Sequence, residues 1–172
     1  MTGTVSIDEN PSEALRDPPD VGEGMDFKLI ELLFFAYRDF VSDADDNLSS
    51  YGFGRAHHRV LHFVNRRPGL SVAELLEILQ ITKQSLGPIL KQLVYTGFLV
   101  QEAGTLDRRQ RLLYPTQKGR NLSFQLMKMQ SSRIQNALNG VENQDRELIE
   151  RFLFGMIEPD DRTLVENLLR SG

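Results

Sequence analysis

Residues 70–97 decide the fold, and they read LSVAELLEILQITKQSLGPILKQLVYTG. The start of this stretch fits a capping box, in which the Ser71 hydroxyl accepts from the amide of Glu74 and the Glu74 carboxylate accepts from the amide of Ser71. After a short turn, Thr82 can cap a second helix, and Gly97 suits the position that follows the end of that helix. Two capped helices joined by so tight a turn are typical of a helix-turn-helix.

The second helix of this pair, residues 82–96, has one apolar and one polar face. Spacings of three and four residues place Leu86, Ile89, Leu90 and Leu93 on the same side. The outward side then holds Gln84, Pro88, Lys91, Gln92 and Tyr95. A proline at this position removes one backbone hydrogen bond and weakens the interior of a helix by up to about 3 kcal/mol.

A β-hairpin is predicted directly after this helix. Phe98–Gln101 and Arg111–Tyr114 have the character of short strands, and the polar stretch 102–110 forms the tip between them. Pro115 closes the second strand, since proline cannot continue a ladder. Helix, turn, helix and hairpin in this order predict a winged helix with a two-stranded wing.

Further helices are predicted on both sides of the winged helix. Apolar residues recur with helical spacing over residues 26–47, 55–65, 117–138 and 143–156, and a short helix follows Pro159. In the helix over 143–156 we expect Leu148, Ile149 and Phe152 to be buried. The predicted fold class is mainly α (α+β), namely a winged helix-turn-helix flanked by N- and C-terminal helices.

Charge divides the chain into parts. The 172 residues carry a net charge of −4, but residues 54–120 hold eleven Lys and Arg against four acids, so that segment has a net charge of +7. Residues 1–24 hold six acids against one arginine and predict a disordered acidic arm. A basic block inside an acidic chain favours a surface that binds a polyanion, and chance clustering is the alternative.

Composition excludes several classes of protein. The chain has no cysteine, which excludes disulfides, thiolate catalysis and cysteine-ligated zinc. Its longest apolar run, residues 32–37, is far shorter than the roughly 20 residues that span a bilayer. The acidic N-terminus differs from a signal peptide, so we expect a cytoplasmic protein that does not bind membranes. We find no catalytic motif and expect no enzymatic activity.

Over roughly residues 25–155 the sequence resembles the MarR family of bacterial transcription regulators, and within it the PetP-like branch. The stretches that carry the resemblance are Leu70–Leu76, Ile81–Leu86, Leu93–Leu99, Asp107–Arg109 and Thr116–Arg120. Pro88 and Pro115 depart from the family pattern. The resemblance implies an obligate homodimer, a triangular molecule, and a small-molecule pocket between the dimerisation and DNA-binding parts.

The resemblance therefore implies that residues 25–172 form a single domain, which follows the acidic arm at residues 1–24. Residues 54–116 would be the winged-helix DNA-binding part, and residues 26–53 and 117–172 would be dimerisation helices. The resemblance implies a pseudo-palindromic double-stranded DNA operator, with recognition helix 82–96 in the major groove and wing 102–110 in the minor groove. Arg109 matches the family's minor-groove arginine, and Asp107 matches the carboxylate that positions it.

The candidate DNA-binding residues are polar or basic positions on these two elements and at the end of the preceding helix. A glutamine can pair with adenine, and a lysine can reach guanine or a phosphate, whereas solvated surface is the alternative for both residue types. The candidates are Thr82, Lys83, Gln84, Ser85, Pro88, Lys91, Gln92, Asp107, Arg108, Arg109, Arg66 and Arg67. The last two are predicted to contact phosphates without sequence preference.

His58 and His62 stand four residues apart on one predicted helix. That spacing can hold a divalent metal, but the sequence offers no fixed third ligand, so we expect no metal and no other cofactor. Phe34, Tyr37 and Arg38 are candidates, with the two histidines, to line an effector pocket. The alternative is that the aromatic residues belong to the core and the histidines to ordinary packing.

The sequence therefore predicts a homodimeric, sequence-specific DNA-binding transcription regulator that a small-molecule effector modulates. The alternative is a winged-helix module that binds proteins and has no specific affinity for DNA. Pro88 and the acidic arm at residues 1–24 favour this alternative, while the net charge of +7 over residues 54–120 favours the regulator.

Overall fold

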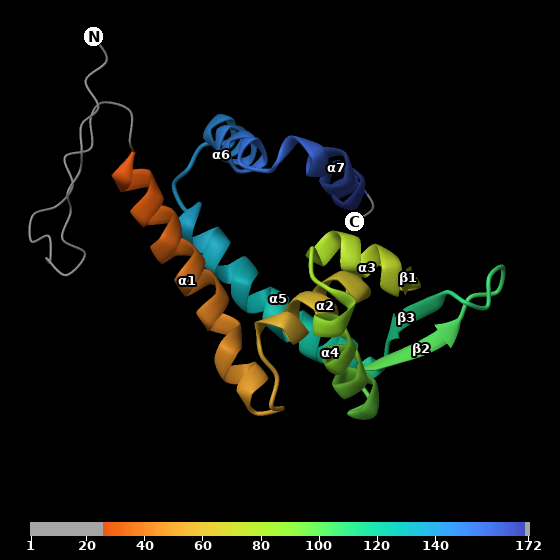
Figure 1. Cartoon of the computed structure of the whole chain (residues 1–172). Coiled ribbons are helices and arrows are strands. Elements are labelled where there is room, and N and C mark those ends of the chain that lie inside the picture. Colours follow the sequence, from red (N-terminus) through yellow and green to blue (C-terminus); the bar gives the residue numbers. More distant parts are fainter. Residues whose placement is uncertain (1–25, 171–172) are drawn as a thin grey trace, which may run out of the picture. The chain divides into compact units, whose positions relative to one another are not determined.

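The computed structural model describes residues 26–170 of the chain (Figure 1). The predicted acidic arm, residues 1–24, lies outside the described residues. The chain divides into two units, residues 1–35 and 36–172, and each is considered by itself. In the described part of the first unit, Asp26 Oδ1 accepts a 2.9 Å hydrogen bond from the amide of Leu29, where helix α1 begins.

The order of helices and strands agrees with the predicted winged helix, and the predicted helices agree with the structure to within about two residues at each end. The elements are α1 (Phe27–Ser49), α2 (Arg55–Arg66), β1 (Leu70–Ser71), α3 (Val72–Leu79), α4 (Lys83–Tyr95), β2 (Leu99–Ala103), β3 (Arg111–Pro115), α5 (Gln117–Ala137), α6 (Asn143–Gly155), the 3-10 turn η1 (Pro159–Asp161) and α7 (Arg162–Arg170). The predicted fold class is confirmed. No helix among residues 26–170 is long and apolar enough to span a membrane.

The sheet has a strand that the sequence did not predict. Its order is β1-β3-β2, with all neighbours antiparallel, and Leu70 pairs with Leu113 while Gln101 pairs with the same residue from the other side. The hairpin of β2 and β3 extends away from the helices (Figure 1). The third strand joins the helix-turn-helix to the wing, because β1 leads directly into α3.

Predicted caps begin three of the helices. The capping box of Ser71 and Glu74 is present, with hydrogen bonds of 3.2 and 2.8 Å between the two residues. Thr116 Oγ1 accepts from the amide of Gly119 at 3.1 Å and donates to the carbonyl of Gly97 at 2.7 Å. The start of α5 is therefore fixed against the segment that follows α4.

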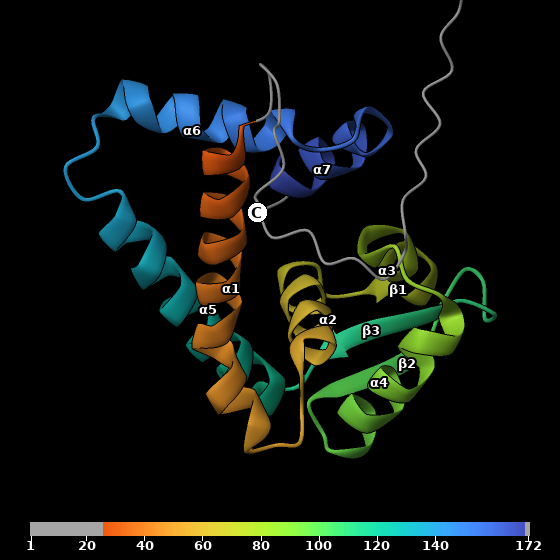
Figure 2. The ribbon, with the colours of Figure 1, turned by 60° about the vertical axis from the view of Figure 1, so that its left-hand side comes forward.

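The core lies between α2, α3, α4, the first half of α5 and the sheet, and Ala44 and Leu48 at the end of α1 also belong to it. Helices α2, α3 and α4 and the sheet gather on one side of the second unit (Figure 2). The members of the core are apolar side chains that are almost completely buried, including Val60, Leu61, Val64, Leu75, Leu86, Leu93, Phe98, Leu113 and Leu126. This cluster fixes the helix-turn-helix onto the sheet without any buried, unpaired polar side-chain atom among the described residues.

Helix α6 does not contribute to this core. Leu148, Ile149 and Phe152, which we expected to be buried, have exposed fractions of 57%, 38% and 49%. The expectation is wrong for the single chain because α6 and α4 lie at opposite ends of the second unit in both views (Figures 1 and 2). The apolar spacing of α6 is therefore that of a helix whose apolar face the described part of its own chain leaves open.

Candidate nucleic-acid interface

The N-terminus of α4 is organised by Thr82, as the sequence predicted. Its Oγ1 accepts from the amide of Ser85 at 3.2 Å, and the two hydroxyl oxygens lie 2.9 Å apart. The side chains of Lys83 and Gln84 in the same turn are exposed and point away from the core. This end of α4 therefore presents a cation and an amide at a helix N-terminus, where the helix dipole favours an anion.

Helix α4 continues through Pro88, which lies exposed on its outer side. Proline has no amide hydrogen, so the carbonyl of Gln84, four residues earlier, receives no helical hydrogen bond from this position. Pro88 thus removes a donor from α4 without interrupting the helix.

Gln92 does not lie on the outer face of α4, where the sequence analysis placed it. The side chain is half-buried, and its Oε1 lies 2.9 Å from Nε2 of His57 on α2. Its Nε2 donates to the carbonyl of Gly52 at 3.3 Å. Helical spacing alone placed Gln92 at the boundary between the two faces, and the polar partners on α2 and the preceding loop draw it inward.

The tip of the wing is a closed turn. Asp107 Oδ1 accepts from the backbone amide of Arg109 at 2.8 Å, and the carbonyl of Asp107 accepts from the amide of Gln110 at 3.0 Å. A Cβ on Gly104 would lie 2.6 Å from the carbonyl oxygen of Asp107. Asp107 therefore shapes the backbone around Arg109, and among the described contacts its carboxylate bonds to the Arg109 amide and not to the guanidinium.

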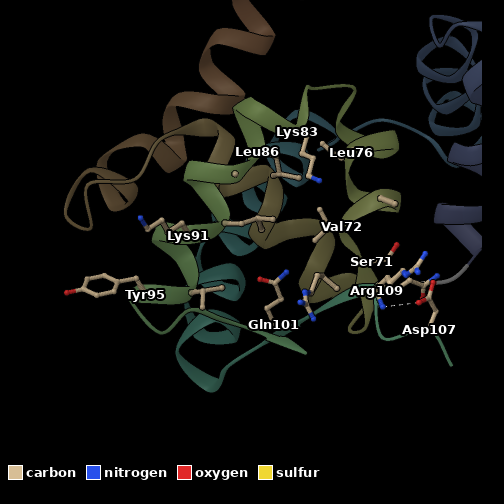
Figure 3. A pocket seen from close by; sticks show the side chains of 16 residues that line it. Ser71, Val72, Leu76, Lys83, Leu86, Lys91, Tyr95, Gln101, Asp107 and Arg109 are labelled. Carbon is tan, nitrogen blue, oxygen red and sulfur yellow. Dashed lines mark hydrogen bonds between the residues drawn. The ribbon is translucent and has the colours of Figure 1, made fainter. Parts of the chain in front are cut away.

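A cavity of about 880 Å³ lies between α3, α4 and the wing (Figure 3). Its apolar side includes Val72, Leu76 and Leu86, and four cationic side chains surround it, namely Lys83, Lys91, Arg109 and Arg111. All four are exposed, and within residues 26–170 none of them forms an ion pair. Asp107 is the one acid in the lining, so the cavity has an excess of three positive charges, which favours an anionic ligand.

Arg111 was missed in the sequence analysis. It stands at the start of β3, directly after the tip of the wing, and it is one of the eleven Lys and Arg of residues 54–120. Its place in that basic segment beside the tip is the signal that could have found it. Of the other predicted basic residues, Arg108 and Arg66 are exposed, and Arg67 is half-buried at the end of α2, where its amide donates to the carbonyl of Phe63.

The candidate effector residues are not brought together into a described cavity. His58 is buried and His62 is half-buried, and burial lowers the pKa of both imidazoles below the usual value. Tyr37 has an exposed fraction of 60%, and Arg38 donates to Asp39 at 2.7 Å. Phe34 belongs to the first unit and is also exposed, so neither aromatic ring is part of the core of the chain.

The described residues also contain no group of three or more histidine, aspartate or glutamate side chains that could hold a metal ion. The effector pocket stays a prediction. The interface around α4 and the wing is thus the site that the structure supports best.

Comparison with known proteins decides the family. Residues 51–110 match the family model described as the MarR family. The chain is also 40% identical over 132 residues to the HTH-type transcriptional regulator PetP of Rhodobacter capsulatus, an alignment that covers 77% of this chain and 80% of that protein. The chain belongs to the MarR family.

Solved structures of other proteins share the fold of this MarR-family chain. FabT of Streptococcus pneumoniae, solved in complex with DNA, superposes with a TM-score of 0.66 at 16% identity and covers 82% of this chain and 97% of its own. A MarR protein of Peptoclostridium difficile gives a TM-score of 0.67 at 15% identity, with 91% and 100% covered. This MarR-family chain is thus a homologue of transcriptional regulators with the fold predicted from residues 70–97.

Proposed function

We propose that this MarR-family protein is a homodimeric, sequence-specific regulator that binds double-stranded DNA through α4 and the wing. The observation that carries the proposal is the set of four cations around the cavity between these elements. None of them forms a described ion pair, and they outnumber the single acid of the lining, Asp107. Duplex DNA presents a regular array of phosphates that such a surface can bind.

The two elements would divide the contacts between the grooves. The major groove is about 12 Å wide and admits an α-helix, so α4 would place Lys83, Gln84 and Lys91 against base edges and phosphates. The exposed arginines of the wing tip, Arg108 and Arg109, suit a narrow minor groove with its enhanced negative potential. Thr82, Ser85, Arg66 and Arg67 would contact the phosphate backbone, where affinity is gained without sequence preference.

Dimerisation through the terminal helices is the second part of the proposal. Leu148 and Phe152 on α6 and Met156 directly after it are about half-exposed, and their spacing of four residues places them on one side of the helix. Contiguous apolar surface of this kind marks an interaction site in a soluble protein. A second copy is the occupant that the family membership favours, and two copies of α4 would then bind two half-sites of a pseudo-palindrome.

A small-molecule effector completes the proposal. It would bind between the dimerisation and DNA-binding parts and change the separation of the two α4 helices. The candidates from the sequence, Tyr37, Arg38, His58 and His62 together with Phe34, keep this role as a hypothesis. Thermal denaturation of the protein against a panel of small molecules tests it, because a ligand that binds the folded state raises the melting temperature.

DNA binding is tested by titrating the full chain with random duplex at several salt concentrations and by selecting bound fragments from genomic DNA. We expect affinity for random duplex to fall steeply with salt, since each neutralised phosphate contributes about 0.9 to the slope of log K against log salt. We also expect the selection to enrich one pseudo-palindromic sequence. No enrichment together with a flat salt dependence would favour the alternative of a protein-interaction module.

A further inference from the structure

The first turn of α2 contains a histidine whose ring has two defined partners. Gly54 caps this helix and has no side chain with which to accept from the first amides, but the amide of Gly54 itself donates to Nδ1 of His57 at 3.2 Å. The imidazole of His57 also stacks on the ring of Phe53, with centroids 4.8 Å apart and an angle of 7° between the planes. The ring is therefore fixed in both position and orientation.

These contacts determine the tautomer of His57. A nitrogen that accepts from a backbone amide carries no hydrogen, so Nδ1 is unprotonated and the hydrogen of the neutral ring is on Nε2. Nε2 lies 2.9 Å from Oε1 of Gln92 and can only donate to it. With Oε1 facing the imidazole, Nε2 of Gln92 faces the carbonyl of Gly52 at 3.3 Å, where it acts as a donor. Every group in this chain of hydrogen bonds has a partner of the opposite kind.

The chain of hydrogen bonds joins the cap of α2 to the second half of α4. The other anchors of α4 on the core are apolar, chiefly Leu86, Leu90 and Leu93. Apolar packing is non-directional. It therefore fixes how closely α4 lies against the core better than it fixes the rotation of α4 about its own axis. Gln92 provides a directional contact, and it is the only residue of α4 for which a side-chain hydrogen bond to α2 is described.

Rotation of α4 about its axis decides where its outer side chains point. Functional side chains need placement within about 10–20° to make their intended contacts. Gln84 and Lys91 are exposed, Lys91 lines the cavity, and neither side chain has a described partner that would correct a rotation. The orientation of the proposed base-reading side chains thus depends on the contact at Gln92.

We propose that His57 is a positioning residue for DNA recognition, which fixes the rotation of α4 through its Nε2–H donor to Gln92 without contacting DNA. This inference rests on the proposed function, and it adds a residue that sequence analysis did not select. It assigns Gln92, earlier a candidate for DNA contact, to the support of the recognition helix.

The test compares two replacements of His57 in the full-length chain. His57→Phe keeps a ring to stack on Phe53 but removes both hydrogen bonds, and we expect it to weaken binding to the selected operator by about 10-fold, the value of one typical hydrogen bond. His57→Gln supplies an amide oxygen for the amide of Gly54 and an NH₂ donor for Gln92, and glutamine is itself a capping-box residue at this position. We expect this variant to retain operator affinity within about 3-fold.

Affinity for random duplex separates positioning from direct contact. Positioning predicts that His57→Phe leaves random-duplex affinity unchanged, whereas an equal loss for both DNAs would mean a phosphate contact and would overturn the inference. The matched control is Asn65→Leu, which removes a side-chain hydrogen bond on the same helix, 2.8 Å to the carbonyl of Leu61, that does not reach α4. Asn65→Leu should leave the ratio of operator to random affinity unchanged.

Two further measurements complete the test, and the first of them uses only the wild-type protein. Nuclear magnetic resonance of the imidazole nitrogens in the wild-type protein should show the Nε2–H tautomer of His57, and the Nδ1–H tautomer would overturn the inference. Gln92→Met should reduce the same affinity ratio as His57→Phe, and the double variant should lose no more than either single variant. Full additivity would overturn the inference, and absence of any DNA binding by the wild-type chain would overturn the proposed function first.

Discussion

The side-chain amide of Gln80 donates a 2.7 Å hydrogen bond to Oδ2 of Asp161, a residue 81 positions later in the chain. Gln80 ends α3 with φ 50 and ψ 46, and it is the only residue other than glycine with a positive φ among residues 26–170. The left-handed conformation costs an ordinary residue about 1–2 kcal/mol. The turn between α3 and α4 therefore retains a strained glutamine that is bonded to the segment before α7.

Substitutions of Gln80 separate these two effects. Gln80→Ala loses the hydrogen bond and keeps the strain, so we expect the free energy of unfolding to fall by about 1 kcal/mol. Gln80→Gly loses the same hydrogen bond but relieves the strain, and its stability should lie within about 0.5 kcal/mol of wild type. Urea denaturation measures both. A glycine variant less stable than the alanine variant would contradict the assignment of strain to this position.

Gly119 in the first turn of α5 should not tolerate a side chain. A Cβ there would clash with the carbonyl oxygen of Phe98, which is backbone and cannot move aside without shifting β2. We expect Gly119→Ala to lower the free energy of unfolding by about 3 kcal/mol or more, as in other overpacked cores. Gly155→Ala is the control, because nothing lies within 4 Å of its Cβ position. That change should be neutral or slightly stabilising.

The apolar side of α6 should support self-association. We expect Phe152→Glu to raise the dissociation constant of the dimer by at least about 100-fold, since an isologous interface loses the burial of two phenylalanines and gains two charges. Arg151→Gln changes the net charge by the same amount at an exposed neighbouring position and should leave association unchanged. Light scattering over a concentration series measures both variants, and a stable wild-type monomer at micromolar concentration would refute the interface.

Arg109 should contribute more to operator affinity than any charge outside residues 54–120. By analogy with a good base contact, its loss should cost about 1–3 kcal/mol for each wing. Asp107→Ala should have a smaller effect of the same sign, because Asp107 orders the backbone of the tip. Titration of one operator at several salt concentrations tests both, with Arg170→Ala as the control. Arg170 lies in α7, paired with Glu166 at 3.3 Å, and its loss should change nothing.

Stability should fall as the pH is lowered below about 6.5, the usual pKa of histidine. Burial lowers the pKa of His58 and His62 in the folded chain, so the unfolded chain binds more protons in the window between the ordinary and the lowered values. The free energy of unfolding must then decrease as the pH falls through that window. Urea denaturation at pH 7.5 and 5.5 should show this decrease, and His58→Gln should reduce it. A decrease of the same size in that variant would exclude His58 as its source.

The carboxylates contribute at lower pH. The ion pair with Arg133 lowers the pKa of Asp43, and hydrogen bonds from Ser71 lower that of Glu74. Their stabilisation is present above the usual carboxylate range and disappears only as the pH falls below about 4.5. The loss of stability due to the histidines and the loss due to the carboxylates therefore occur in different pH ranges, and one series of urea denaturations over pH separates them.

Sequence reasoning located the features that depend on near neighbours in the chain. The capping residues Ser71, Thr82 and Thr116 act over three residues, so their identity and spacing sufficed to predict the starts of α3, α4 and α5. Strand β1 was not predicted because it is only two residues long, and because its pairing of Leu70 with Leu113 joins positions that are distant in sequence. No local pattern distinguishes such a strand from a helix cap.

The errors at the site have the same origin. Gln92 lies at the edge between the two faces of α4, and only the distant partners His57 and Gly52 draw it inward. The apolar spacing of α6 predicted an amphipathic helix correctly but could not show whether the cover for its apolar face comes from the same chain. Periodicity specifies which side of a helix avoids water and leaves the identity of its neighbour open.

The contacts at Thr116 connect the start of α5 to both proposed DNA-contacting elements, α4 and the wing. The hydroxyl of Thr116 bonds to the carbonyl of Gly97, where α4 ends, and the backbone of Phe98, where β2 is about to begin, is packed against Gly119. At the other end of α5, Arg133 donates to both carboxylate oxygens of Asp43. We therefore expect a tilt of α5 to move the recognition helix and the wing together as one body. Spectroscopic distance measurements between labels on α4 and the wing should then remain constant while distances between the two copies change, and because the chain has no cysteine of its own, each label can be placed by introducing one.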